Sequence, residues 1–197
     1  GGGKMMLIYK ERRAFLSEKR NELEKLSGFG AQLRKYMSRA RITKIDLVPG
    51  ERIIKITLEK KDQKWFVYLE LFAKGNVVFC DGDGKIMGVQ QRQLWTDKKI
   101  QTGQQYVLDG REDLRQISEE GFIELLDSRK ENASKKIAMS IGKPYAVELC
   151  KRVAVDPLAT ELRDGEKKNL YGAFKALLTE DVSAHKYTDG HVTPVKF

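Results

Sequence analysis

The sequence is poor in the residues from which most disulfide, metal and thiol sites are built. Its 197 residues include two cysteines and two histidines. Cys80 and Cys150 lie too far apart for a disulfide framework or a zinc-binding spacing, and His185 and His191 have no cysteine beside them. We therefore expect no metal and no cofactor, and we interpret the thiols as reduced, as is typical of the cytoplasm.

Long apolar runs are missing as well. No run of apolar residues comes near the roughly 18 that a membrane-spanning helix requires. The N-terminus lacks both an apolar segment of signal-peptide length and a small-residue cleavage site. The sequence thus predicts a cytoplasmic protein with no membrane partner, and its hydrophobic content of 41% is enough for a core.

Patterns for catalysis are scarce too. The N-terminal Gly-Gly-Gly-Lys lacks the spacing and the following Ser or Thr of a phosphate-binding loop. The Asp-Gly-Asp-Gly run at residues 81–84 lacks the ligand positions and the closing Glu of a calcium loop, and its composition is typical of a turn. Since no Ser-His-Asp or Cys-His grouping is evident, the sequence predicts a binding protein rather than an enzyme.

Positive charge is in excess and is unevenly spread. The net charge is +9. Residues 1–45 contain 12 Lys or Arg and 4 Glu, a balance of +8, whereas the rest of the chain contains 25 basic and 24 acidic residues. One strongly basic segment on a nearly neutral body predicts a surface for a polyanion. The alternative is a solvated helix face or an unpaired chain end.

A helix predicted at residues 29–42 carries part of this charge. Phe29, Leu33, Tyr36 and Met37 recur at helical spacing, and no proline interrupts them. We therefore expect one buried face and one strongly basic face. The candidate nucleic-acid-binding residues on the basic face are Arg34, Lys35, Arg39 and Arg41.

From residue 41 to about residue 91 the hydrophobic period changes to two, which is typical of strands. Turn residues such as Lys74-Gly75-Asn76 separate β-branched and aromatic runs. Five consecutive antiparallel strands are predicted, at residues 41–48, 52–60, 65–72, 76–81 and 85–91. The third, WFVYLELF, is apolar on most of both faces and is expected to be central and covered on both sides.

Helical periodicity replaces the strand pattern beyond residue 111, with Ser118 as a predicted N-cap. The predicted fold class is α+β: an antiparallel β-sandwich-like sheet with a flanking helix, followed by a helical domain. The expected organisation is a β-rich domain at residues 1–110, a helical domain at 111–183, and a terminal β-hairpin at 184–197 that returns to the β domain. Two short strands, at residues 4–9 and 12–17, are expected ahead of the helix.

Residues 140–155, SIGKPYAVELCKRVAV, have the pattern helix, glycine-containing turn, helix. In helix-hairpin-helix modules such a turn points backbone N–H groups and the start of the second helix at a nucleic-acid phosphate. Gly142 and Lys143 are therefore candidate nucleic-acid-binding residues. The alternative is a structural corner, because turn glycines are common for steric reasons alone.

The run QLRKYMSRARITKIDLVPGERIIKITLE, with the hairpin WFVYLELFAKGNVVFCDGDGKIM, resembles the N-terminal module of the NFACT family. This family includes the bacterial and archaeal RqcH proteins and the nuclear export mediator factor, and it was first described as fibronectin-binding protein A. The matching positions are Leu33, Arg34, Lys35, Tyr36, Arg41, Ile42, Arg52, Ile53, Glu70, Leu71, Gly75, Asn76 and Asp81. The later IGKPYAVELCKRVAVDP is similar to an archaeal-type segment of the family, so the resemblance spans residues 29 to about 195.

The resemblance implies a tRNA-binding factor of ribosome quality control. Such factors bind the large ribosomal subunit that carries an obstructed nascent chain, recruit tRNA there, and support C-terminal tailing of the chain. The resemblance also implies a fold similar to the formamidopyrimidine DNA glycosylases, a β-sandwich followed by a helix-hairpin-helix domain. The family's Asp-Arg pair, implicated in tRNA engagement, aligns with Glu51-Arg52, and Arg52 is expected to face solvent where a strand opens.

Two departures from the family pattern are expected to matter. Family members usually have a longer segment ahead of this module, and a coiled coil and further modules beyond it, so we expect an excised or truncated module that binds tRNA more weakly than a complete factor. A glycosylase-like enzyme is one alternative, although its N-terminal Pro-Glu is absent. A fibronectin-binding adhesion module is the other, against which the missing signal peptide speaks. DNA stays open as a further partner.

Overall fold

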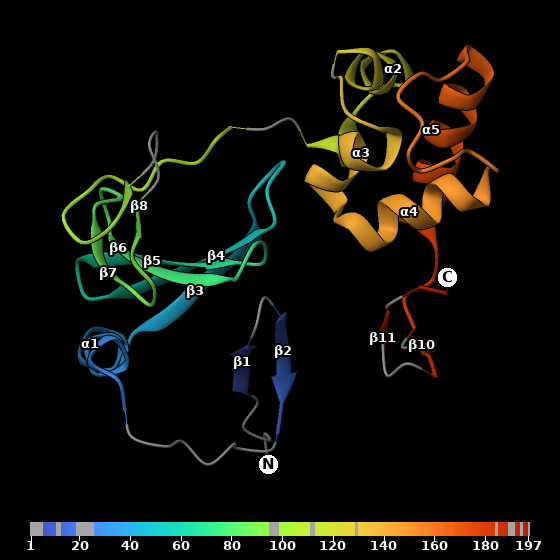
Figure 1. The fold of residues 1–197 in the computed structure, drawn as a ribbon. Helices are drawn as coiled ribbons and strands as arrows, with labels where there is room; N and C mark the ends of the chain where they lie inside the picture. Colours follow the sequence, from blue (N-terminus) through green and yellow to red (C-terminus); the bar gives the residue numbers. More distant parts are fainter. Residues whose placement is uncertain are drawn as a thin grey trace. The chain divides into compact units, whose positions relative to one another are not determined.

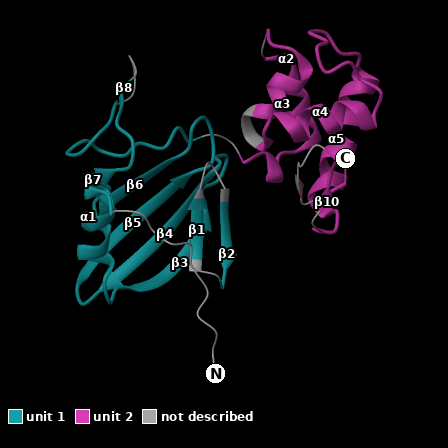
Figure 2. Cartoon of the chain, turned by 60° about the horizontal axis from the view of Figure 1, so that its bottom comes forward, with its two compact units in different colours: residues 1–111 teal, residues 112–197 magenta. Residues whose placement is uncertain are grey.

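The computed structural model describes residues 6–10, 13–18, 26–94, 99–110, 113–128, 130–183, 185–188, 192–193 and 195–196. Contacts divide the chain into two compact units, residues 1–111 and residues 112–197 (Figure 2). Each unit has a hydrophobic core of its own. The terminal strands belong to the second unit by these contacts, and the return of residues 184–197 to the β domain stays a prediction.

The first unit is built on a five-stranded antiparallel sheet whose strands follow one another in chain order (Figure 1). The strands are β3 (Arg41–Leu47), β4 (Ile53–Lys60), β5 (Gln63–Glu70), β6 (Asn76–Asp81) and β7 (Ile86–Val89). The predicted meander is therefore confirmed. Gly75 lies in the turn between β5 and β6 with φ 73°, a left-handed conformation that a residue without Cβ adopts at little cost.

The sheet is buried on both faces in its centre because alternate residues of β4, β5 and β6 point to opposite sides. One face contributes Leu58, Trp65, Val67 and Phe79 to a core, and the other contributes residues such as Tyr68 to a second core. From Trp65 to Glu70, β5 is buried at all but one position. This confirms that WFVYLELF is the central strand with both sides covered.

Helix α1 (Gly28–Met37) packs on the first of these cores through Phe29, Leu33 and Tyr36. Its N-terminus is capped by Ser27, whose Oγ accepts a hydrogen bond from the Gly30 N–H at 3.0 Å. The amide of Gln32 donates to the Met87 carbonyl of β7 at 2.8 Å. These contacts attach the helix to the β7 side of the sheet.

Helix α1 is shorter than the predicted span of residues 29–42. It ends at Met37, and the Ser38 N–H donates to the Arg34 carbonyl as a C-cap. Arg39 then has φ 63°, which reverses the chain, and Arg41 opens β3 opposite Glu59. The expectation that Arg39 and Arg41 lie on the helix is therefore wrong, because strand pairing begins four residues after the helix ends.

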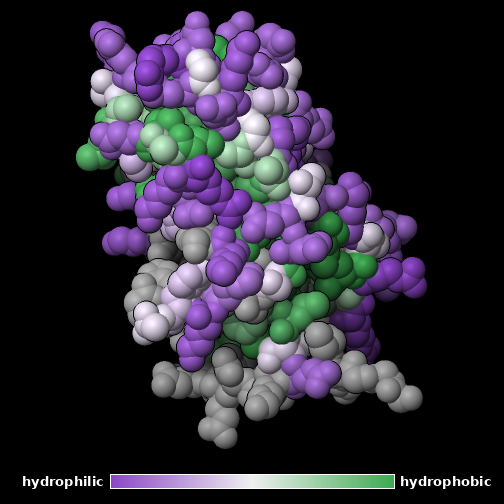
Figure 3. All heavy atoms as spheres, turned by 90° about the vertical axis from the view of Figure 1, so that its right-hand side faces the viewer, coloured by the Kyte–Doolittle hydropathy of each residue, from purple (hydrophilic) through white to green (hydrophobic). Residues whose placement is uncertain are grey.

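Short strands complete the first unit. β1 (Met6–Lys10) and β2 (Arg13–Ser17) lie where two short strands are predicted near the N-terminus, and they pair antiparallel. The Tyr9 hydroxyl donates to the Glu70 carbonyl at 2.7 Å. β8 (Gln93–Leu94) pairs with β9 (Lys99–Ile100). The edge strand β3 leaves Ile42, Ile45 and Leu47 exposed. On one face of the molecule, hydrophobic side chains form patches among hydrophilic ones (Figure 3).

The second unit is helical, with the short 3-10 helix η1 (Leu114–Gln116) ahead of its longer helices. These are α2 (Glu119–Asp127), α3 (Ala133–Ile141), α4 (Lys143–Arg152) and α5 (Asp164–Thr179), and they surround one core (Figure 1). Ser118 caps α2 by accepting from the Gly121 N–H, as predicted. β10 (His185–Lys186) pairs with β11 (Val192–Thr193) within the predicted terminal hairpin, whose residues 189–191 lie outside the described residues.

Both thiols are fully buried, and this has a consequence for thiol chemistry. Burial, with a smaller contribution from Asp81, raises the pKa of Cys80 to about 12, and burial raises the pKa of Cys150 to about 11. Because the thiolate is the reactive form, we expect neither thiol to react with Ellman's reagent in the folded protein at pH 8. Both should react in denaturant. Rapid reaction of either thiol without denaturant would contradict this.

The same shifts predict how stability depends on pH. Above pH 9, the ordinary thiol pKa, the unfolded chain loses the Cys80 proton while the folded chain keeps it up to about pH 12. The contribution of Cys80 is therefore fully present below pH 9 and is lost as pH rises through this window. Urea titrations at pH 8 and pH 10.5 should show the first unit less stable at the higher pH, and Cys80→Ala should reduce that difference.

Candidate nucleic-acid interface

The predicted basic residues gather where α1 meets the start of β3. Arg34 and Lys35 are exposed in the last turn of the helix, and Arg39 and Arg41 are exposed in the segment that follows. The last-turn pair also complements the negative end of the helix dipole, so part of its effect is on helix stability. We call Arg34, Lys35, Arg39 and Arg41 the basic end of α1.

Sequence reasoning missed a lysine at this place. The Lys60 Nζ donates to the Ser38 carbonyl at 3.0 Å, which brings its ammonium next to the end of α1. Lys61 follows in the exposed turn between β4 and β5. The available signal was the charged run KKDQK at residues 60–64, whose composition is also typical of a hairpin turn. The turn therefore adds positive charge beside the basic end of α1.

Arg52 lies elsewhere. Arg41 is opposite Glu59 in the sheet register, whereas Arg52 precedes Ile53 at the other end of β4. Glu59 is six residue steps along the strand from Ile53, which is about 20 Å at roughly 3.3 Å a step. The antiparallel register therefore puts Arg52 and the basic end of α1 at opposite ends of the sheet, and a shared phosphate-binding surface stays a prediction.

The local geometry around Glu51 and Arg52 also differs from expectation. The chain turns tightly here, since the Glu51 N–H donates to the Val48 carbonyl at 3.1 Å and the Val48 N–H donates to the Ile53 carbonyl at 2.9 Å. Glu51 is 8% exposed and Arg52 is half-buried. The tight turn buries Glu51. Arg52, which follows it, is less exposed than predicted for a residue that faces solvent at the start of a strand.

Gly142 and Lys143 lie in the second unit, at the corner between α3 and α4. Gly142 has φ 92° and ψ 151°, is buried, and donates its N–H to the Ala138 carbonyl at 2.8 Å. Lys143 is exposed at the first position of α4, and Pro144 follows. The glycine therefore ends one helix and starts the next, which is a structural role, and the exposed lysine stands at the positive end of the α4 dipole.

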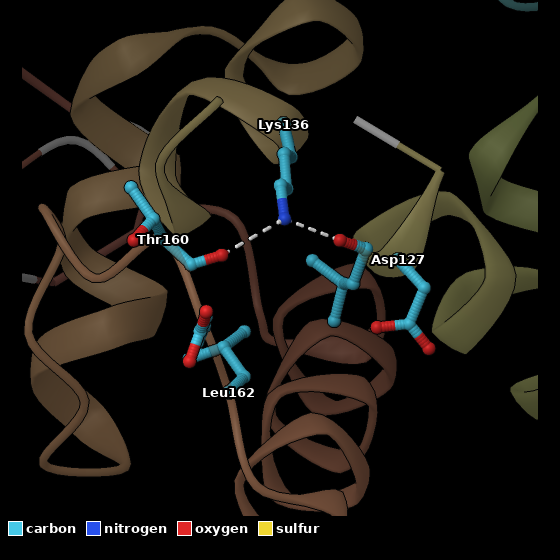
Figure 4. A pocket seen from close by; sticks show the side chains of 6 residues that line it. Asp127, Lys136, Thr160 and Leu162 are labelled. Atoms are coloured by element: carbon cyan, nitrogen blue, oxygen red, sulfur yellow. Dashed lines mark hydrogen bonds between the residues drawn. The ribbon is translucent and has the colours of Figure 1, made fainter. Parts of the chain in front are cut away.

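A buried lysine lies in a pocket of about 220 Å³ in the same unit (Figure 4). Lys136 is 3% exposed. Its Nζ donates to the carbonyl of Leu126, near the end of α2, and to the carbonyl of Thr160 at 3.4 Å. The ammonium thus ties α3 to α2 and to the loop ahead of α5, and it meets the negative end of the α2 dipole.

Within the described residues, no three His, Cys, Asp or Glu side chains come together in a way that could hold a metal ion. In the part of the chain that the structure describes, no helix has the length and apolar character needed to cross a bilayer.

An antiparallel five-stranded sheet with a basic flanking helix, followed by several helices, defines an α+β module with a candidate polyanion surface. The family model for the NFACT N-terminal and middle domains matches residues 10–194. The chain belongs to the NFACT family, together with the Rqc2 and RqcH factors of ribosome quality control and the fibronectin-binding proteins.

Curated relatives carry names from ribosome quality control. The chain is 26% identical over 192 residues to the archaeal Rqc2 homolog aRqcH of Methanocaldococcus jannaschii, an alignment that covers 91% of this chain and 29% of that protein. It is 34% identical over 104 residues to ribosome quality control complex subunit 2 of Schizosaccharomyces pombe, covering 49% of this chain and 10% of that protein. The chain therefore spans less than a third of the length of these relatives.

Solved structures match the fold across both units. The N-terminal part of the fibronectin/fibrinogen-binding protein from Streptococcus suis has a TM-score of 0.66 at 20% identity, covering 94% of this chain and 70% of that one. The fibrinogen-binding protein from Staphylococcus aureus has a TM-score of 0.62 at 16% identity, covering 96% of this chain and 76% of that one. At these identities the likeness concerns the fold.

Proposed function

We propose that this chain is the nucleic-acid-binding module of a cytoplasmic ribosome quality control factor. It binds tRNA and helps to bring it to the obstructed large ribosomal subunit, where nascent chains receive C-terminal tails. Membership of the NFACT family, with the Rqc2 and RqcH relatives, is the observation that carries this proposal. The role is one of binding and positioning, without catalysis.

The basic end of α1 supplies the main phosphate contacts in this proposal. Its four side chains are exposed, and Lys60 adds a fifth cation beside them. Phosphate contacts position a nucleic acid and dominate its affinity, whereas they carry little sequence information. RNA is therefore bound largely by its shape and backbone, which suits a factor that accepts a folded tRNA.

Glu51 and Arg52 make a second contact, at the other end of β4. A half-buried guanidinium is held more firmly than one on a free arm, so Arg52 positions a phosphate or a base edge with less loss of side-chain entropy. The buried Glu51 supports the turn from which Arg52 extends. Glu51→Ala is therefore expected to weaken tRNA binding rather than to relieve repulsion.

The corner between α3 and α4 contributes a third contact of the helix-hairpin-helix type. Lys143 and the start of α4 present positive charge together. Because Gly142 has a positive φ, a residue with a Cβ there is strained, so Lys143→Gln is the variant that tests the contact without disturbing the corner.

A salt titration tests the proposal. We expect the chain to bind tRNA in preference to duplex DNA of similar length, with an affinity that falls steeply as salt rises. Each phosphate contact contributes about 0.7 to 0.9 to the slope of log K against log salt concentration. The double variant Arg34→Gln with Lys35→Gln should therefore lower this slope by about one to two. Fluorescence anisotropy between about 50 and 200 mM salt measures it.

The matched control removes two exposed lysines of the same unit that the proposal does not use. Lys85→Gln with Lys99→Gln changes the net charge equally, and it should leave the slope nearly unchanged. A parent protein with no salt slope, or with equal affinity for tRNA and heparin, would refute the proposal. Equal effects of the two double variants would show that net charge, rather than the basic end of α1, decides binding.

A second candidate function has support in the names of the solved relatives. The matching structures from Streptococcus suis and Staphylococcus aureus are described as fibronectin- or fibrinogen-binding proteins. An adhesion role predicts saturable binding to immobilised fibronectin that survives at high salt. Parallel capture on fibronectin and on tRNA distinguishes the two functions.

A further inference from the structure

The face of the sheet that turns away from α1 carries a row of three aromatic rings. The centroids of Tyr106 and Tyr68 are 4.5 Å apart, and those of Tyr68 and Phe66 are 6.2 Å apart. Tyr106 and Tyr68 are buried, whereas Phe66 is partly exposed. The row thus runs from the core to an open end at Phe66.

Basic side chains surround this open end. The Lys55 Nζ lies 3.9 Å from the Phe66 ring centroid, and the Lys64 Nζ lies 6.0 Å from it. In the sheet register, Thr57 is opposite both Phe66 and Lys44. Because residues directly opposite one another in a sheet share a face, Lys44 of the edge strand belongs to the same surface as the exposed ring.

The charge of this surface is positive. We call Phe66, Lys44, Lys55 and Lys64, with Arg41 at the edge, the Phe66 surface. Two carboxylates reduce this positive charge, since Asp46 pairs with Lys44 at 3.0 Å and Glu59 pairs with Lys64 at 3.4 Å. Four cations against two carboxylates favour an anionic partner, while Lys55 contacts aromatic rings.

We propose that the Phe66 surface binds an unpaired stretch of RNA, with one base stacked on the Phe66 ring and the neighbouring lysines on its phosphates. Stacking of bases on aromatic rings, beside a positively charged track, is how proteins hold single strands without reading their sequence. Lys55 lies over the ring in the free protein and moves aside to a phosphate when the base arrives. A base in a duplex is stacked between its neighbours and cannot meet a ring on a sheet.

This surface is separate from the helix face of α1. Phe66 packs against the core that contains Tyr68, whereas α1 packs against the core on the other side of the sheet. The inference rests on the proposed role in RNA binding, to which it adds the class of nucleic acid that this surface takes. Arg41 is the one residue shared with the basic end of α1.

A fluorescein-labelled uridine decamer and a blunt RNA duplex of similar length serve as probes, with the whole chain as the protein. We expect the parent to prefer the decamer. Phe66→Leu should weaken decamer binding about tenfold, or about 1.4 kcal/mol, whereas Phe66→Tyr, which keeps a ring, should bind within about twofold of the parent. Lys55→Gln should lower the salt slope by about 0.7.

Phe72→Leu is the matched control, because Phe72 packs partly exposed against the same core near the β5–β6 turn. It should bind the decamer like the parent, and thermal melting confirms that each variant is folded. The inference is overturned if the parent does not bind the decamer, if Phe66→Leu binds it like the parent, or if Phe72→Leu loses as much. It is also overturned if an acidic peptide displaces the decamer as well as unlabelled RNA does and the peptide still binds the Phe66→Leu variant.

The two proposals fail separately. If the double variant Arg34→Gln with Lys35→Gln binds tRNA like the parent while decamer binding still depends on Phe66, the proposed tRNA contact is refuted and the role of the Phe66 surface is supported. If tRNA binding depends on the basic end of α1 while Phe66→Leu leaves decamer binding unchanged, the tRNA contact is supported and the role of the Phe66 surface is refuted.

Discussion

Replacing Asn76 by leucine should destabilise the first unit by about 3 kcal/mol. Asn76 is fully buried at the start of β6. Its Oδ1 accepts from the N–H groups of Val77 and Gln91, and its Nδ2 donates to the Gln91 carbonyl at 3.0 Å. Leucine has a similar volume but makes none of these bonds, and each buried backbone group left without a partner costs about 1–3 kcal/mol.

Urea titration followed by tryptophan fluorescence measures this effect, because Trp65 is buried in a core of the first unit. Gln63→Leu is the control, since Gln63 is exposed at the start of β5 in the same unit, and it should change stability by no more than about 0.5 kcal/mol. A loss below about 1 kcal/mol for Asn76→Leu would mean that the link from β6 to Gln91 is dispensable.

Lys136→Glu should cost the second unit about 4 kcal/mol or more, which is a large part of the total stability of a domain. Lys136 is only 3% exposed, and its ammonium donates to two carbonyl oxygens. A carboxylate there would face acceptors and the negative end of the α2 dipole, as a buried charge with no partner. The helical unit should lose its cooperative unfolding transition.

Lys135→Glu is the matched control for this charge reversal. The neighbouring Lys135 side chain is 66% exposed and pairs with Glu131 at 3.4 Å, and such a surface pair is worth about 0.5 kcal/mol. Lys136→Met separates the two causes, because it removes the hydrogen bonds without introducing a negative charge, and its cost should be intermediate. Far-UV circular dichroism during urea titration reports on the helices. Equal losses for Lys135→Glu and Lys136→Glu would contradict the buried role.

The same two lysines show where local pattern stops being informative. In the run ASKKIAMSI the sequence offers two adjacent, chemically identical side chains. Helical periodicity alone gives no reason for one of them to be buried to 3% exposure with its ammonium on two carbonyls. That outcome depends on where α2 ends and where the loop at Thr160 passes, and both are contacts between segments far apart in the chain.

Asn76 makes the same point for the sheet. The sequence predicts a turn at Lys74-Gly75-Asn76, and the positive φ of Gly75 agrees with that. Turn composition, however, predicts an exposed asparagine, whereas this one is buried and bonded to Gln91, fifteen residues later. The bond depends on β7 returning beside β6, which the turn residues do not encode by themselves.

The sequence by itself determined the features that arise from neighbouring residues: the meander, its central strand, the Ser118 cap and the basic character of the α1 segment. Alternation, capping and turn propensity act over a few residues, so they can be recognised without tertiary contacts. The tertiary structure decided the end of α1 at Met37, the burial of Glu51 and Lys136, and the separation of Arg52 from Arg41 along β4. These follow from strand register and packing between distant segments, which place side chains in space by pairing partners that no local pattern specifies.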